Sequence, residues 1–272
     1  MIMCGMSAAF SALFGTPLAA AVFSMEVVSV GIMHYSALVP CVIASLTAHG
    51  IASACGITPE IFPIASIPAF TAKNALIIGI FAVLCALVSI LFCTTLHNAE
   101  RLYKRFFKNP YVRALAGGLI VIGLTMLVGN QTYNGTGMNI ITGCMEGKTV
   151  FPLAFLLKMV FTAATLGAGY KGGEIVPTLF IGSTFGTFFA SAFGCSIPLC
   201  AAVGMGAVFC GVTNSPITSL MICFELFGFD GMPYFLIAIA LSYMLSGYYG
   251  LYSSQKIIYS KYKTEYINRK TH

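Results

Sequence analysis

Residues 5–27 read GMSAAFSALFGTPLAAAVFSMEV, and residues 204–226 repeat this pattern as GMGAVFCGVTNSPITSLMICFEL without a gap, 204 − 5 = 199 positions later. The identical residues are Gly5, Met6, Ala8, Phe10, Pro17 and Glu26 in the first copy and Gly204, Met205, Ala207, Phe209, Pro216 and Glu225 in the second. Proline matched to proline and glutamate to glutamate over an unbroken interval is hard to obtain by chance. In a membrane protein, an internal repeat is typical of a transporter whose site lies between the repeated parts.

The composition of the chain is that of a polytopic membrane protein, which predicts an all-α fold. The chain is 58% hydrophobic and 8% charged, whereas soluble domains have about 25% charged residues. Residues 75–96 carry no charge over about the length that crosses a bilayer. We expect a multi-pass protein in a lipid bilayer, most simply the cytoplasmic membrane of a bacterium.

The net charge of +6 is concentrated in two basic clusters, one at residues 101–113 and one at residues 256–270. The positive-inside rule predicts that both clusters face the cytoplasm. Basic residues at the ends of membrane helices explain these clusters fully, so we expect no nucleic-acid partner.

Several apolar segments are far shorter than the roughly 20 residues that a helix needs to cross a bilayer. Thr16-Pro17 and Ser215-Pro216 each place a hydroxyl residue at an N-cap position and proline at the first helical position. A helix that starts inside a membrane leaves backbone N–H groups unpaired, so its start must line a cavity or a ligand. Because such helices typify inverted repeats, we expect antiparallel copies.

The densest motif is GAGYKGGEIVPTLFIGSTFG at residues 167–186. Its early glycines allow the backbone to approach a ligand closely. A glycine-rich turn that leads into a helix presents free N–H groups and the positive end of the helix dipole, which favours an anion. No G-K-[ST] follows, so the motif is not a nucleotide phosphate-binding loop.

These residues also carry a family resemblance. GGEIVPTLFIG resembles the G-x-F-x-P element of the CLC family of chloride channels and proton-coupled anion exchangers, and GTPLAAAVFSMEV resembles its N-A-P-L-A-G-x-L-F-x-x-E-E segment. GVTNSPITSLMICFEL resembles the family's R-A-P-L-T segment, and GLYSSQKI resembles its P-L-Y-S segment. The four motifs occur in the family's order and imply a CLC-like inverted-repeat architecture.

The resemblance also implies a site. The backbone around Gly173, Glu174, Ile175 and Val176 would coordinate the permeating anion, and the hydroxyl of Tyr252 would point at it. Without the motif, Tyr252 would be read as an interfacial aromatic residue. The resemblance further implies a homodimer formed by segments near 17–55 and 216–248.

Two departures from the chloride-transporting pattern indicate which anion moves. The family's Phe position is Ile175, preceded by Glu174, and the second glutamate of the exchangers is replaced by Val27. An acid at this place resembles the branch of the family that exchanges fluoride for protons, so Glu174 is the expected proton carrier. The alternative is that Glu174 forms a structural ion pair with Lys171. For Glu26 and Glu225 we expect a structural role, such as hydrogen bonding to backbone.

The offset between the two copies predicts how much of each membrane repeat the chain contains. The counterpart of Glu174 would fall at 174 − 199 = −25, so we expect residues 1–55 to be the remainder of an incomplete first repeat and residues 73–248 to be a complete second repeat. Residues 250–272 would form an amphipathic helix and a basic tail. Met1 would then be internal to a longer protein, unless the gene is naturally short, and this chain alone would not transport.

Three other interpretations remain open: a passive CLC chloride channel, a non-transporting membrane subunit, and an intramembrane enzyme. The enzyme has least support, because the chain contains no H-E-x-x-H and its ten cysteines show no C-x-x-C spacing. We therefore expect no enzymatic activity, no metal and no cofactor.

Overall fold

The computed structural model describes residues 1–57, 59, 61–64, 67–263 and 265–271, and this part of the chain is mostly helical. The helices are α1 (Ile2–Phe14), α2 (Pro17–Glu26), η1 (Tyr35–Ala37, a 3-10 turn), α3 (Leu38–Ala54), α4 (Ala72–Phe106), α5 (Pro110–Val128), α6 (Met138–Met145), α7 (Ala154–Gly167), α8 (Ile175–Phe193), α9 (Ile197–Thr213), α10 (Pro216–Phe227) and α11 (Met232–Leu245). The strands are β1 (Ser29–Val30), β2 (Lys256–Tyr259) and β3 (Tyr266–Lys270). The predicted all-α membrane fold is confirmed.

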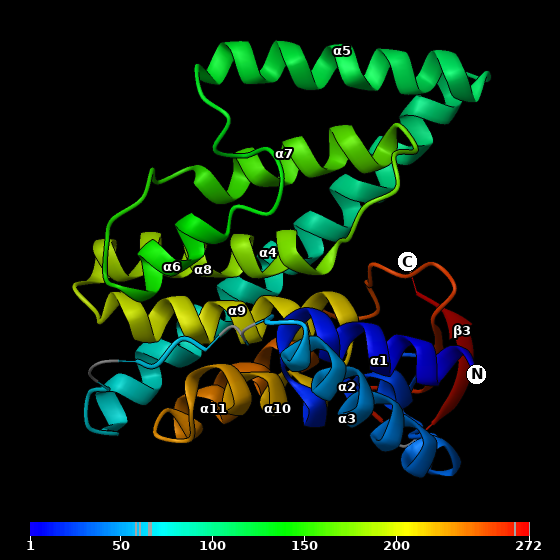
Figure 1. Ribbon diagram of the computed structural model, residues 1–272. Coiled ribbons are helices and arrows are strands. Elements are labelled where there is room, and N and C mark those ends of the chain that lie inside the picture. Colours follow the sequence, from blue (N-terminus) through cyan, green and yellow to red (C-terminus); the bar gives the residue numbers. More distant parts are fainter. Residues whose placement is uncertain (58, 60, 65–66, 264, 272) are drawn as a thin grey trace.

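Helix lengths follow the irregular apolar segments of the sequence. Among the described residues, four stretches are long and apolar enough to cross a membrane, namely Tyr35–Ala54, α4, α5 and α8, and six further apolar helices have only 10–17 residues. Figure 1 shows α8 and α9 side by side in the middle of the molecule, with α5 and α7 toward one edge and α1–α3 with α10 and α11 toward the other.

The two copies of the repeat fold alike. Each has a helix, one left-handed residue and a short helix that begins with proline: α1, Gly15 (φ 70°) and α2 in the first copy, and α9, Asn214 (φ 58°) and α10 in the second. The predicted helix starts at Pro17 and Pro216 are confirmed. The hydroxyls expected to cap these helices do not do so, since neither Thr16 nor Ser215 makes a side-chain cap hydrogen bond.

Glutamates from the opposite copy take over this capping. Glu225 at the end of α10 accepts hydrogen bonds from the N–H groups of Leu18 (3.0 Å) and Ala19 (2.8 Å) at the start of α2. Reciprocally, Glu26 at the end of α2 accepts from the N–H groups of Ile217 (3.0 Å) and Thr218 (2.8 Å) at the start of α10. Because each helix ends where the other begins, α2 and α10 are antiparallel, as the inverted-repeat prediction required.

Small residues hold the second repeat together. A Cβ on Gly182 of α8 would collide with the carbonyl of Gly204 of α9, and a Cβ on Gly186 would collide with the carbonyl of Cys200. The two backbones therefore touch along this line, as is typical where small residues bring membrane helices together.

The expected amphipathic helix after residue 250 is wrong, because the chain there forms strands. β2 pairs in parallel with β1, which follows α2, and in antiparallel fashion with β3. Ile257 is fully buried while Lys256 is exposed, which fits the alternation of a strand. Strand pairing with β1 satisfies backbone groups that a helix would have satisfied internally.

Gln255 fixes this C-terminal segment to both repeats. Its amide nitrogen donates to the carbonyls of Val27 (2.7 Å) and Thr213 (2.8 Å), at the ends of α2 and α9. Its amide oxygen accepts from the side chain of Asn214 at 3.0 Å. Tyr252, three residues earlier, is thereby held against the membrane helices.

The surface that the resemblance assigns to a homodimer is exposed and apolar on α3. Val39, Ile43 and Leu46 are 66%, 60% and 56% exposed. Pairing of this surface with a second copy stays a prediction.

Candidate anion site

The start of α8 is the centre of the candidate site. α7 ends at Gly167, and a turn through Gly169 (φ 97°) leads to Glu174, the N-cap residue of α8. At this end, the N–H of Thr178 donates to the carbonyl of Glu174 at 3.2 Å. Pro177 has no N–H, so the N–H groups of Ile175 and Val176 are those of the first turn, where a helix offers them no acceptor of its own. The turn thus presents donors together with the positive end of the helix dipole.

All five residues predicted for the site line one cavity of about 490 Å³. The wall is formed by Met6, Ala9, Phe10, Leu13, Phe14, Phe23, Gly172, Gly173, Glu174, Ile175, Val176 and Tyr252. The turn before α8 and Tyr252 supply the polar part of this wall, while α1 and α2 supply an apolar part. Their roles toward an anion stay predictions, but the structure brings the residues together.

The apolar wall was missed by the sequence reasoning. Phe10 packs against Phe14 and Phe23, with ring centroids 4.6 and 4.9 Å apart. These rings come from the first copy of the repeat, so the cavity lies between that copy and the turn that begins α8. The shared Phe10/Phe209 position was the available signal, and Phe209 does pack on Phe23 of the first copy, with ring centroids 6.0 Å apart.

Glu174 is not part of an ion pair with Lys171. The two ion pairs in the described part of the chain are Glu100–Lys104 and Glu146–Lys148, so the structural-pair alternative is wrong. Burial, and secondarily the negative charge of Glu100, raises the pKa of the Glu174 carboxyl. Burial also raises the pKa of Tyr252, whose hydroxyl therefore keeps its proton as a donor.

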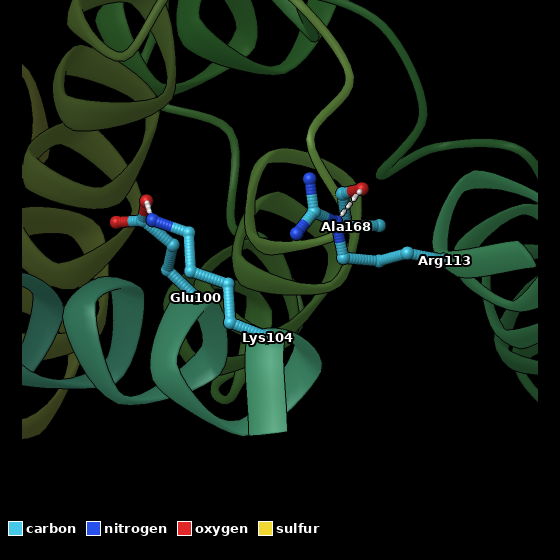
Figure 2. Close-up of polar contacts among 4 residues, drawn as sticks. All are labelled: Glu100, Lys104, Arg113 and Ala168. Atoms are coloured by element: carbon cyan, nitrogen blue, oxygen red, sulfur yellow. Dashed lines mark hydrogen bonds and ion pairs between the residues drawn. The ribbon is translucent and has the colours of Figure 1, made fainter. Parts of the chain in front are cut away.

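The turn that carries Glu174 is anchored by α5. Arg113 of α5 donates from Nε to the carbonyl of Ala168 at 3.1 Å, and the hydroxyl of Tyr170 donates to the carbonyl of Ala114 at 2.8 Å. Figure 2 shows Arg113 reaching Ala168 near the Glu100–Lys104 pair of α4. Arg113 therefore belongs to the support of the site as well as to the basic cluster.

Comparison with known proteins gives a consistent result. The family model "Voltage gated chloride channel" matches residues 1–247. The chain is 33% identical over 268 residues to the "Chloride/fluoride channel protein" of Pseudomonas syringae pv. tomato, covering 96% of this chain and 59% of that protein. It is 27% identical over 256 residues to the "Voltage-gated ClC-type chloride channel ClcB" of Salmonella typhimurium, covering 89% and 60% respectively.

Solved structures agree with these sequence matches. The crystal structure of a CLC-type fluoride/proton antiporter superposes with a TM-score of 0.90 at 33% identity, covering 93% of this chain and 64% of that one. A eukaryotic CLC transporter superposes with a TM-score of 0.69 at 19% identity, covering 90% and 43%, which shows the fold alone. The chain spans about 60% of the length of the curated relatives it matches.

Proposed function

The chain belongs to the voltage gated chloride channel family, and from this premise we propose that it serves fluoride/proton antiport with Glu174 as the proton carrier. The observation that carries the proposal is the carboxylate of Glu174 on the wall of a cavity otherwise suited to an anion. That cavity is lined by the amide-rich turn before α8 and by the hydroxyl-bearing Tyr252.

A carboxylate and an anion repel each other in such a site unless the carboxyl takes up a proton. Protonation converts Glu174 from a pure acceptor into a donor, so anion and proton would favour each other's presence. The raised pKa of Glu174 makes uptake possible closer to neutral pH. This linkage between the charge of Glu174 and the occupancy of the cavity would couple anion movement to proton movement, and the opposite direction of the two fluxes is proposed from the fluoride/proton antiporter that the chain resembles.

Fluoride suits the proposed site better than chloride because it is small and accepts strong hydrogen bonds. A protonated carboxyl, a phenol and backbone N–H groups are all donors. The names of two relatives point the same way, since one is a chloride/fluoride channel protein and one a fluoride/proton antiporter. The ClcB relatives are named voltage-gated chloride channels, which makes a passive chloride channel the second candidate.

The two candidates separate in one experiment. The whole protein is reconstituted into vesicles, and fluoride and chloride fluxes are recorded with ion-selective electrodes under an imposed pH gradient. Antiport predicts that the pH gradient drives fluoride uphill. A flux that follows only the anion gradient and the voltage would instead identify a channel.

Replacing Tyr252 with Phe tests the proposed anion contact. The variant keeps the ring but removes one hydrogen-bond donor to a charged acceptor, which contributes about 1.5–3 kcal/mol, so we expect fluoride binding to weaken about tenfold to 150-fold. Titration calorimetry of the purified protein with fluoride measures this change. Tyr259→Phe is the matched control, since Tyr259 is 43% exposed on β2, and equal affinity in both variants would exclude Tyr252 as a ligand.

A further inference from the structure

Two cysteines face each other where α8 turns into α9. Ser196 is the N-cap residue of α9, so Cys195 is the residue before the cap and Cys200 is the fourth residue of the helix. Side chains at these two positions commonly pack together across the start of a helix, an arrangement known as the hydrophobic staple. The local geometry of the turn therefore brings two thiols into contact.

The two cysteines are neighbours in the structure. Both line the same cavity of about 230 Å³, and their thiols are close enough to influence each other. Cys195 is partly exposed, whereas Cys200 is 1% exposed. One thiol of the pair can thus meet a reagent, and the other can be reached only through the first.

The membrane orientation places this cavity outside the cell. The basic residues at the C-terminal end of α4, Lys104 and Arg105, face the cytoplasm by the positive-inside rule. Lys73 and Asn74 at the opposite end of α4 line the cavity of the two cysteines. The pair therefore lies on the outer face, where oxidising conditions allow disulfides to persist.

We propose that Cys195 and Cys200 form a thiol–disulfide modification site whose co-reactant is a disulfide, either a small one or that of a disulfide-donating oxidoreductase. The Cys195 thiolate attacks one sulfur of the co-reactant, releasing the first thiol and leaving a mixed disulfide. The Cys200 thiolate then attacks the sulfur of Cys195 and releases the second thiol. The two cysteines are oxidised, the co-reactant is reduced, and both thiol protons pass to the released thiolates.

The surrounding structure favours closure between these two sulfurs. The carbonyl of Cys200 lies against Gly186 of α8, so the helix that carries Cys200 is held in place. Cys195 lies in the turn, where its N–H bonds to the carbonyl of Ala190 at 3.0 Å and its thiol lies 3.8 Å from the carbonyl of Phe193. These contacts and the packing of α9 on α8 hold the two cysteines beside each other at the start of α9.

The experiment uses the purified, reduced protein with oxidised glutathione as the probe, followed by alkylation, chymotryptic digestion and mass spectrometry. Cleavage after Phe193 and Leu199 separates the two cysteines, so a disulfide alone keeps their peptides together. We expect this linked species in the wild type and in Cys55→Ser, the control that removes an exposed cysteine elsewhere.

Two variants test the order of attack. Cys200→Ser should stop at a stable glutathione adduct on Cys195, and Cys195→Ser should lose modification of the buried Cys200. The proposal is overturned if both cysteines of the wild type remain alkylated while Cys55 reacts. It is also overturned if Cys200 becomes linked to Cys85, the buried thiol of α4 that lies near it.

Discussion

Changing Glu174 to Gln is expected to abolish proton movement through the whole protein while anions continue to pass down their gradient. The amide keeps the size of the side chain at the start of α8, and it can still donate a hydrogen bond toward the cavity. It cannot bind and release a proton at any pH of the experiment. The pH gradient should therefore no longer drive fluoride uphill in reconstituted vesicles.

The pH profile gives a second readout of the same substitution. Burial and the nearby charge of Glu100 raise the pKa of Glu174, so its protonated fraction at a given pH exceeds that of an ordinary glutamate. Wild-type fluoride flux should persist above the usual titration range of a carboxyl and fall as the pH rises through the raised pKa. The Gln variant stays neutral, so its flux should be flat over this range.

Glu146→Gln is the matched control for this substitution. Glu146 forms an exposed ion pair with Lys148, and its side chain is 53% exposed. It does not line the cavity of Glu174, so its loss should leave both the uphill transport and the pH profile unchanged. If Glu174→Gln retained proton-driven fluoride movement at the wild-type rate, Glu174 would not be the proton carrier.

The sequence predicted much of this architecture because local patterns determine it. Pro17 and Pro216 cannot continue a preceding helix but can begin a new one, so the breaks before α2 and α10 could be predicted from the sequence. The gathering of Glu174 and Tyr252 on one cavity followed from motif order and not from spacing, since 78 residues separate them, 252 − 174 = 78. The family resemblance predicted that these two residues share a site, which the local sequence around either residue could not predict.

What could not be predicted depends on contacts between distant segments. Residues 256–259 form a strand because the backbone of β1 lies beside them and pairs with them. No local pattern in the sequence predicts a pairing partner so far away in the chain. Lys158 is 2% exposed and donates to the carbonyls of Tyr133 and Gly135. A single charge in an apolar run was the signal for Lys158, because an ionisable residue at that depth is expensive, but its acceptors could not be named.

Replacing Glu26 with Ala is expected to produce the largest loss of stability in the first repeat. The side chain accepts from two backbone N–H groups of α10 and also from the hydroxyl of Thr218 at 2.6 Å. Each buried donor left unpaired costs about 1–3 kcal/mol, so the free energy of unfolding should fall by about 3–5 kcal/mol. Unfolding in mixed micelles, followed by circular dichroism, measures the change.

Glu225→Ala provides the symmetry-related control. Glu225 caps α2 with the same geometry, but it accepts only from Leu18 and Ala19, and the Leu18 bond lies at the surface. The loss of Glu225 leaves two donors unpaired instead of three, so we expect a smaller loss in the free energy of unfolding, about 2–3 kcal/mol. Equal losses in the two variants would show that the additional bond from the Thr218 hydroxyl adds no stability.

The double variant shows whether the two caps act as one unit. Glu26 and Glu225 lie at opposite ends of the same antiparallel helix pair, so either cap alone can still hold one end of α2 against α10. If the caps are independent, the loss in the free energy of unfolding of the double variant should equal the sum of the two single losses. If the caps act together through the helix pair, the loss of the double variant should differ from that sum. Phe23 of α2 lines the anion cavity. Weaker fluoride binding in the double variant than in either single variant would therefore show that the contact between α2 and α10 helps to form the site.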